Sequence, residues 1–169
     1  MGKTGKGTGP AGSGRRLARI ALIAGLYAVL TVMPPFSAMS YGPIQVRVSE
    51  CLTVLPYLSA DAIYGLWLGC IAANLGSPFL PWDVTLGAAA TLVAGCLTHL
   101  APNELLAPLP PVVVNALVVA MYVSGWSRAY LPTALYIALG EFIACYVLGY
   151  PLLRFISRNA AARRYFDRE

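Results

Sequence analysis

Long apolar stretches alternate with short polar or proline-rich segments along this chain. The apolar stretches cover residues 17–33, 46–58, 62–75, 83–100, 112–123 and 131–155. At about 1.5 Å of rise per residue, the longer ones come close to or exceed the ~30 Å hydrocarbon core of a bilayer. The pattern therefore predicts an all-α integral membrane protein with six transmembrane helices, of which the second is short.

Prolines and glycines mark the connections between the predicted helices. Pro34-Pro35 ends the first helix, and segments 76–82 and 101–111 each contain several such residues. The first fourteen residues carry almost no large apolar side chain and cannot bury a core. We expect three regions, which are a disordered basic tail over 1–16, a membrane domain over 17–156 and a second basic tail over 157–169.

Composition and charge indicate the setting and the orientation. Hydrophobic residues make up 58% of the 169 residues and charged residues 11%, and the mean hydropathy of +0.67 excludes an ordinary soluble domain. Most basic residues lie near the two ends, at Lys3, Lys6, Arg15, Arg16, Arg19, Arg154, Arg158, Arg163, Arg164 and Arg168. Because positive charge is retained on the cytoplasmic side, both termini are predicted to be cytoplasmic. This clustering explains the net charge of +5 without a nucleic-acid partner.

Two charges interrupt the apolar pattern of the second predicted helix. Arg47 and Glu50 are three residues apart, which places them on one face of a helix. A charge at the centre of a bilayer costs about 2.5–3.5 kcal/mol on insertion scales, so such residues are usually functional. The alternative is an interfacial ion pair that only marks where the helix enters the membrane.

The predicted topology brings polar residues of several helices into the outer half of the membrane. These residues are Arg47, Glu50, Asn74, Asp83 and Glu141. Asn74 and Asp83 also fit the end of one helix and the start of the next. Convergence on one side nevertheless favours a polar cavity that opens outward.

Such a cavity suits a small, flat, polar ligand with several hydrogen-bond donors, such as a purine-like base. A carboxylate can accept two parallel N–H bonds from a guanine-type edge, and an aromatic ring can stack on the base. We expect Glu50 and Glu141 to accept these bonds and Arg47 to orient Glu50. The candidate stacking residues are Tyr41, Trp67, Trp82 and Tyr136, whereas Tyr122 and Trp126 are expected at headgroup level.

Other chemistry has little support in the sequence. Four cysteines stand singly in apolar stretches and His99 stands alone, so we expect no disulfide framework, metal site or cofactor. The glycines of the first residues only superficially match a phosphate loop, because Thr8 stands where lysine is required. No nucleophile, base and orienting group share a recognisable spacing. The chain is therefore predicted to be neither an enzyme nor a binder of ATP, and to need partners.

Small residues repeat at four-residue spacing in the first predicted helix. The two pairs are Ala21 with Gly25 and Ala24 with Ala28. Such spacing lets a second helix approach the backbone closely within a membrane. The partner is either another helix of this chain or a docking subunit, and spacing alone does not choose between them.

Several ordered motifs resemble the queuosine-precursor transporters, the QueT family. They are YGPIQVRVSE at 41–50, LTVLP at 52–56, residues 69–75, LAPLPP at 106–111 followed by Asn115-Ala116, and LGE at 139–141 followed by YVLG at 146–149. The resemblance spans nearly the whole predicted membrane region.

The resemblance implies a six-helix substrate-binding (S) component of an energy-coupling factor (ECF) transporter. Such a component captures a deazaguanine base, preQ0 or preQ1, and delivers it to a membrane coupling subunit with two cytoplasmic ATPases. The resemblance also implies that Ala24 and Ala28, or the pair of Ala21 and Gly25, dock to the coupling subunit. It adds Gln45 and Asn115 to the substrate-binding candidates, beside Tyr41 of the same motif, although the predicted topology places Asn115 nearer the inner side.

Three alternatives to this function remain. The first is an S component for a different vitamin or micronutrient. The second is a structural or assembly protein whose charges only fix helix packing. The third is a membrane-embedded enzyme, which would have to convert the molecule it binds.

Overall fold

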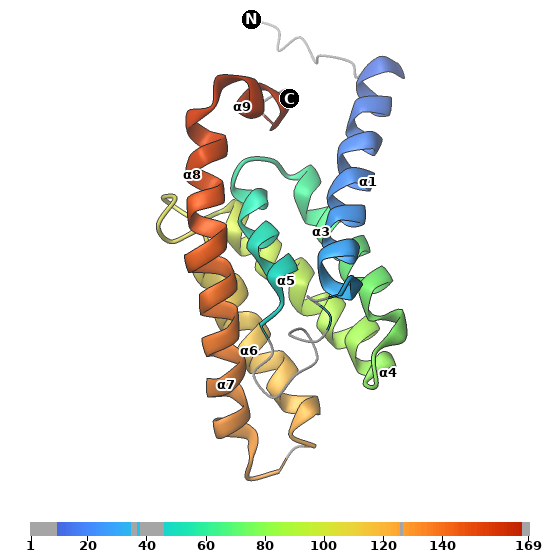
Figure 1. Ribbon diagram of the computed structural model, residues 1–169, viewed down its shortest axis with the longest axis vertical. Coiled ribbons are helices and arrows are strands. Elements are labelled where there is room, and N and C mark those ends of the chain that lie inside the picture. The colour runs from blue at the N-terminus through green and yellow to red at the C-terminus, as the bar shows by residue number, and fades with distance from the viewer. Residues whose placement is uncertain (1–9, 35–36, 38–45, 126, 167–169) are drawn as a thin grey trace, which may run out of the picture.

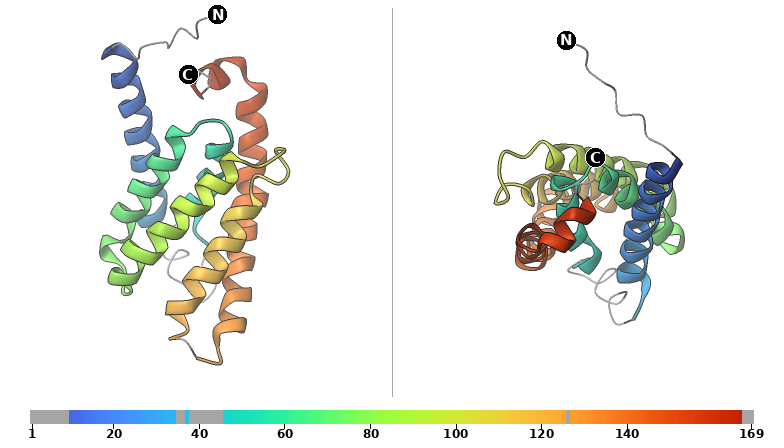
Figure 2. Two further views of the ribbon diagram at one scale, coloured as in Figure 1. Left: turned by 180° about the vertical axis from the view of Figure 1, so that it is seen from behind. Right: turned by 90° about the horizontal axis from the view of Figure 1, so that it is seen from above.

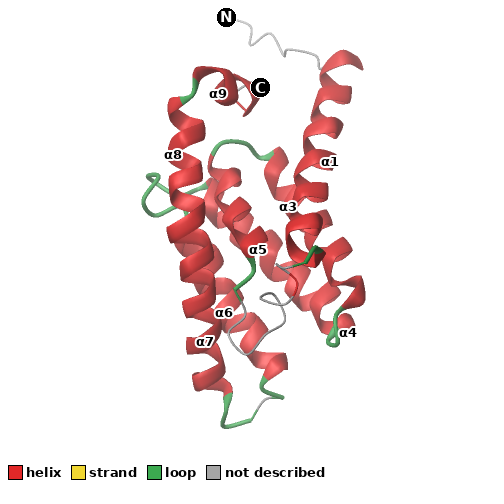
Figure 3. Cartoon of the chain, viewed as in Figure 1, coloured by secondary structure: helices red, strands yellow, loops and turns green. Residues whose placement is uncertain are grey.

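The computed structural model describes residues 10–34, 37, 46–125 and 127–166, and this part of the chain is helical without any strand (Figure 3). The prediction of an all-α chain is therefore confirmed for the described residues. The elements are α1 (Pro10–Val32), η1 (Val48–Tyr57), α3 (Asp61–Ala73), η2 (Asn74–Gly76), α4 (Leu80–Trp82), η3 (Asp83–Gly87), α5 (Ala88–His99), α6 (Leu109–Val123), α7 (Tyr130–Phe142), η4 (Ile143–Gly149), α8 (Tyr150–Arg158) and α9 (Ala160–Phe166).

Successive long helices are neighbours in the bundle. Helix α1 packs on α3, α3 on α5, α5 on α6, and α6 on α7. The short element η1 runs through the middle of the bundle (Figure 1) and contacts α1, α3, α5, α8 and η4. Residues far apart in the sequence therefore meet around η1.

Among the described residues, two continuous helices are long and apolar enough to cross a membrane. They cover Leu80–His99 and Tyr130–Arg158, and the shorter α6 is also apolar. Each of the two long helices contains a π-helical stretch, η3 or η4. Their outer surfaces are apolar, as Leu131 and Leu135 are 65% and 64% exposed. An exposed apolar surface of this kind is typical of a protein that contacts lipid.

The second predicted helix forms a 3₁₀-helix rather than an α-helix. Element η1 contains Pro56, which lacks an N–H group, and all its residues from Ser49 to Pro56 are buried. A 3₁₀-helix rises ~2.0 Å per residue, so ten residues cover about 20 Å instead of 15 Å. Arg47 ends up just before this helix, with an extended backbone (φ −86°, ψ 105°).

Close contact between α1 and α3 depends on two glycines of α3. A Cβ atom added at Gly65 would lie 2.8 Å from Ile23 Cβ, and one added at Gly69 would lie 2.8 Å from Tyr27 Cβ and 2.9 Å from the Ala24 carbonyl oxygen. Real Cβ atoms do not approach so closely, so any larger residue would push the two helices apart.

The start of α1 and the last described helix, α9, lie at the same end of the bundle (Figures 1 and 2). The loop between α6 and α7 lies at the opposite end. Helix α1 begins at Pro10, so residues 10–16 are helical, although the sequence pattern predicts disorder there. At the end of this segment, Arg16 Nε lies 2.7 Å from Asp61 Oδ1 at the start of α3, and this ion pair ties α1 to α3.

Candidate functional site

Polar side chains from several elements meet at a small cavity in the middle of the bundle. Its volume is about 20 Å³, which is room for roughly one water molecule. The residues that line it are Arg47, Glu50, Cys70, Gly87, Thr91, Asn115, Val119, Tyr122, Ile137 and Glu141. They come from the start of η1 and from α3, η3, α5, α6 and α7.

Two buried carboxylates face this cavity from opposite sides of one amide. Asn115 Nδ2 donates to Glu141 Oε1 over 3.2 Å and lies 3.5 Å from Glu50 Oε2. Glu50 is 2% exposed and Glu141 7%. Cys145 lies beneath the pair, with its Sγ 3.7 Å from Glu141 Oε2. A single amide group thus joins side chains of η1, α6 and α7.

Helix α1 reaches the same cluster through Tyr27. The Tyr27 hydroxyl donates a hydrogen bond to Glu50 Oε1, and Tyr27 has no exposed surface. One turn further along, Thr31 Oγ1 donates to Ser49 Oγ over 2.7 Å. These two bonds connect α1 to the first turn of η1.

Asp83 supports the cavity from its side nearest the α6–α7 loop. Both Ser77 and Tyr122 donate hydroxyl hydrogen bonds to its carboxylate. Tyr122 lines the cavity, while Asp83 stands behind it and is 3% exposed. A Cβ atom at Gly87 would lie 3.3 Å from the Tyr122 hydroxyl, so a larger residue at position 87 would crowd this hydroxyl.

Asn74 lies one turn beyond the cavity residue Cys70. Its Nδ2 donates to the Cys70 carbonyl oxygen over 3.0 Å and lies 3.3 Å from Cys70 Sγ. Its Oδ1 atom is buried and accepts no hydrogen bond from a described residue. A buried acceptor of this kind costs about 1–3 kcal/mol when it lacks a donor.

The structure brings four of the sequence-predicted residues to one cavity and places two others around it. Arg47, Glu50, Asn115 and Glu141 line the cavity, whereas Asp83 and Asn74 lie behind lining residues. Asn115 is central because α6 begins at Leu109, with prolines tolerated in its first turn, so this residue lies six positions into the helix. Tyr41 and Gln45 lie outside the described residues.

The aromatic side chains differ from the prediction. Trp82 and Tyr136 are 48% and 57% exposed, and neither lines the cavity. The aromatic residues at the site are Tyr27, which bonds to Glu50, and Tyr122, which lines the cavity and is 6% exposed. The headgroup-level depth of Tyr122 stays a prediction. In the structure, the buried residues of α1 recur every four positions, at Arg19, Ile23, Tyr27 and Thr31, so Tyr27 lies on the face of α1 that packs on the core.

The small residues of α1 divide between its two sides. Ala24 faces Gly69 of α3, and Ala28 packs against the core around α3. Ala21 and Gly25 are exposed, and a Cβ atom at Gly25 would meet nothing within 4 Å. Ala24 and Ala28 therefore pack within the chain, whereas Ala21 and Gly25 are open to a neighbouring helix.

Within the described part of the chain, no three His, Cys, Asp or Glu side chains are grouped as metal ligands. The cavity instead has one guanidinium, two carboxylates and an amide around a volume of about 20 Å³. This arrangement can recognise a polar molecule by hydrogen bonds.

Comparison with known proteins gives one family and one relative. The family model described as QueT transporter matches residues 17–158. A protein of Lactococcus lactis subsp. cremoris (strain MG1363), named Queuosine precursor transporter QueT, is 45% identical over 74 residues. That match covers 44% of this chain and 43% of the relative, so it spans less than half of the relative's length. No solved structure matches the chain.

Proposed function

The chain belongs to the QueT transporter family, and from this premise we propose that it binds a queuosine precursor in the central cavity. The ligand is a deazaguanine base, preQ0 or preQ1. The protein is a membrane protein that serves transport and not catalysis, as the substrate-binding (S) subunit of an ECF transporter.

The observation that carries this proposal is the pair of buried carboxylates bridged by Asn115. Glu50 and Glu141 accept hydrogen bonds from one amide NH₂ group, which offers the same kind of donor as a guanine-type edge. A bound base would replace this amide and donate two parallel N–H bonds to one carboxylate. The second carboxylate is then available to a further donor or an ammonium group of the ligand.

The cavity must expand to admit a base, because about 20 Å³ is far below the ~300–1,000 Å³ of ordinary ligand pockets. The bonds that close it link different elements, since Tyr27 of α1 and Asn115 of α6 both contact Glu50 of η1. In this proposal a ligand exchanges these bonds for its own. Tyr122 is the aromatic ring best placed to cover the base.

We further propose six membrane passages with both termini in the cytoplasm. The start of α1 and α9 lie at one end of the bundle, in keeping with an even number of passages (Figure 2). The basic residues of that end fit the cytoplasmic side. Asp83 and Tyr122 lie toward the other end, so their side of the cavity faces outward in this orientation.

The partners in this proposal are a membrane coupling subunit and two ATPase subunits, which hydrolyse the ATP. Ala21 and Gly25 form the docking face on α1, because they are exposed and leave room for a second helix. Ala24 is already in contact with α3, so it is a less suitable contact for a partner.

A structural role for the polar cluster is the second candidate, and the small cavity favours it. Glu50, Asp83 and Glu141 each have a partner within the chain, as expected for a network that only fixes helix packing. If the protein binds a different vitamin, it is still an S component. Binding tests with several ligands distinguish a vitamin from a queuosine precursor.

Calorimetry of the purified protein in detergent, stripped of endogenous ligand, tests the proposal with preQ0, preQ1 and guanine. We expect submicromolar binding of a deazaguanine base to the wild type, lost in Glu50→Gln and Glu141→Gln. Glu104→Gln is the matched control, because Glu104 loses the same charge in the connection between α5 and α6, away from the cavity. If no base binds to folded protein, the capture role is wrong. If both cavity variants bind a base as the wild type does and are only less stable, the two carboxylates are structural and the base binds elsewhere.

A further inference from the structure

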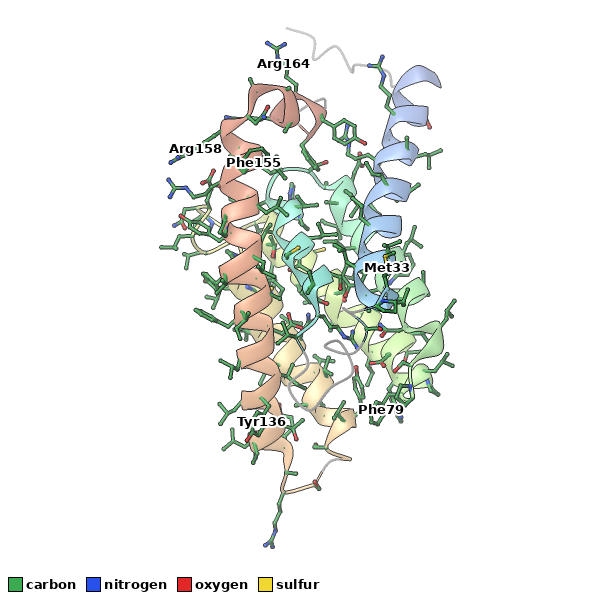
Figure 4. The ribbon with its side chains drawn as sticks, in the orientation of Figure 1. Met33, Phe79, Tyr136, Phe155, Arg158 and Arg164 are labelled. Atoms are coloured by element: carbon green, nitrogen blue, oxygen red, sulfur yellow. The ribbon has the colours of Figure 1, made fainter. Side chains whose placement is uncertain are left out.

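A second and larger cavity lies at the end of the bundle where α1 begins and α9 ends. Its volume is about 530 Å³, and it is lined by Arg15, Ala18, Arg19, Ala161, Arg164 and Tyr165. Figure 4 shows Arg164 at this end of the molecule. The cavity is separate from the central one, with which it shares no lining residue.

Arg19 is built into the wall of this cavity and is only 5% exposed. Its Nη1 donates to Ser59 Oγ over 3.1 Å and lies 3.3 Å from Asp61 Oδ2. Its Nε is buried and makes no hydrogen bond with a described residue. Nη1 also lies 3.4 Å from the Phe166 carbonyl oxygen of α9. The guanidinium is therefore fixed in position between α1, the start of α3 and α9, beside the cavity that it lines.

Positive charge exceeds negative charge around this cavity. Asp61 is the carboxylate there, and it is shared by Arg16 at 2.7 Å and Arg19 at 3.3 Å. Arg15 and Arg164 make no ion pair with a described residue and are exposed. Four arginines and one buried carboxylate thus lie at this end of the bundle, so the cavity has a net positive charge that favours an anionic ligand.

The chemistry of that anion follows from the residue types. Guanidinium groups bind phosphate through several hydrogen bonds in a fixed, fork-like geometry. Tyr165 is 43% exposed and lies under Arg19, whose Cζ is 5.4 Å from the ring centroid. An exposed tyrosine beside arginines is typical of the headgroup level of a membrane.

Apolar side chains continue from the cavity along the outside of α1. Leu17 is 64% exposed, Leu22 52% and Leu26 45%. They offer a surface for acyl chains beginning within one or two helical turns of Arg15. A soluble phosphate would use the arginines alone, whereas a phospholipid would use both the arginines and this apolar surface.

We infer that this cavity binds the phosphate of an anionic phospholipid headgroup. Arg15, Arg19 and Arg164 contact the phosphate, and the acyl chains lie along the exposed leucines of α1. The site goes beyond capture of a base, and it requires only that the protein resides in a membrane.

The test measures thermal unfolding of the full-length protein in neutral detergent as phosphatidylglycerol is added. Phosphatidylcholine with the same acyl chains is the control for the apolar contribution, and glycerol 1-phosphate is the soluble source of phosphate. We expect a saturable rise in Tm with phosphatidylglycerol, and no such rise with either phosphatidylcholine or glycerol 1-phosphate. Arg15→Gln/Arg164→Gln should weaken the apparent affinity for phosphatidylglycerol at least about tenfold. Each arginine near an anionic lipid surface raises the affinity by roughly fivefold, and this variant removes two.

Arg154→Gln/Arg158→Gln is the matched variant, because it removes two exposed arginines from α8 near the same end of the bundle. Its affinity for phosphatidylglycerol should change less than about twofold. Equal losses in both double variants would mean non-specific attraction to a basic surface and would overturn the inference. An equal effect of phosphatidylcholine, or stabilisation by glycerol 1-phosphate without any by phosphatidylglycerol, would overturn it as well.

Asp167 and Glu169 follow α9 and lie outside the described residues. Asp167→Asn/Glu169→Gln is therefore measured alongside the other variants. Phosphatidylglycerol should stabilise it as it stabilises the wild type. Binding that appears only in this variant would show that the chain's own carboxylates fill the cavity, and the inference would be wrong.

Discussion

The hydroxyl of Tyr27 in α1 donates a hydrogen bond to the carboxylate of Glu50 in η1. Tyr27 faces the core, while Ala21 and Gly25 of the same helix face outward. One rigid helix therefore carries both a contact to the cavity and an open face of small residues. In the proposed transporter, docking of the coupling subunit and occupancy of the cavity both act on α1.

Replacing Tyr27 with phenylalanine keeps the ring and removes the hydroxyl. The Glu50 carboxylate then loses a buried donor, so we expect the free energy of unfolding to fall by about 1–3 kcal/mol. Thermal unfolding in detergent measures the change. Tyr136→Phe is the control and should have almost no effect, because Tyr136 is 57% exposed. Equal stability of the two variants would contradict this prediction.

Adding a methyl group distinguishes a packed glycine from an open one. Gly69→Ala places a Cβ atom 2.8 Å from Tyr27 Cβ, so α1 and α3 must separate, at an expected cost of about 1–3 kcal/mol. Gly25→Ala meets nothing within 4 Å and should be neutral or stabilising by up to ~1 kcal/mol. Unfolding curves of the two variants compare the sites, and a stable Gly69→Ala variant would refute the close packing.

Bulk on the exposed face of α1 should block docking without affecting the fold. We expect Ala21→Leu/Gly25→Leu to lose co-purification with a coupling subunit and its ATPases, while the isolated chain keeps its Tm and its affinity for a base. Ala89→Leu, at an exposed alanine of α5, should leave assembly intact. Normal assembly of the α1 double variant would place the docking face elsewhere.

The charge of the central cavity should select between the two precursors. Glu50 and Glu141 line it with Arg47, so two carboxylates face one guanidinium and a ligand with an ammonium group is favoured. We expect the amine preQ1 to bind more tightly than the nitrile preQ0. Glu141→Gln should narrow the difference between the two dissociation constants. A tighter complex with the nitrile in the wild type would contradict this assignment.

The sequence predicted the residues whose type is costly in a membrane. Arg47, Glu50 and Glu141 are recognisable because a charged residue within an apolar stretch is costly in a membrane and is usually functional. The structure places all three at one cavity. Tyr27 and Tyr122 were missed as site residues. A tyrosine is equally suited to the core, the headgroup level and a binding site, so its type carries little information.

The local geometry of η1 could not be predicted from its residues. An apolar stretch with one proline is compatible with either helix type, so its residues alone do not choose the 3₁₀-helix that the structure has. Trp82 and Tyr136 were expected at the cavity, but they are exposed on the outside of the bundle. An exposed aromatic side chain is tolerated there because it can contact lipid instead of water. Which face of a membrane helix is lipid-facing depends on its neighbours, and these are set by tertiary packing.

The small volume of the central cavity has a kinetic consequence. Any ligand larger than a water molecule can enter only after the bonds among Tyr27, Glu50 and Asn115 open. The observed association rate should then level off at the opening rate as ligand concentration increases, instead of rising linearly toward the diffusion limit. The apparent dissociation constant exceeds the intrinsic one by the inverse of the open fraction, so variants that loosen these bonds can bind faster even while they fold less stably.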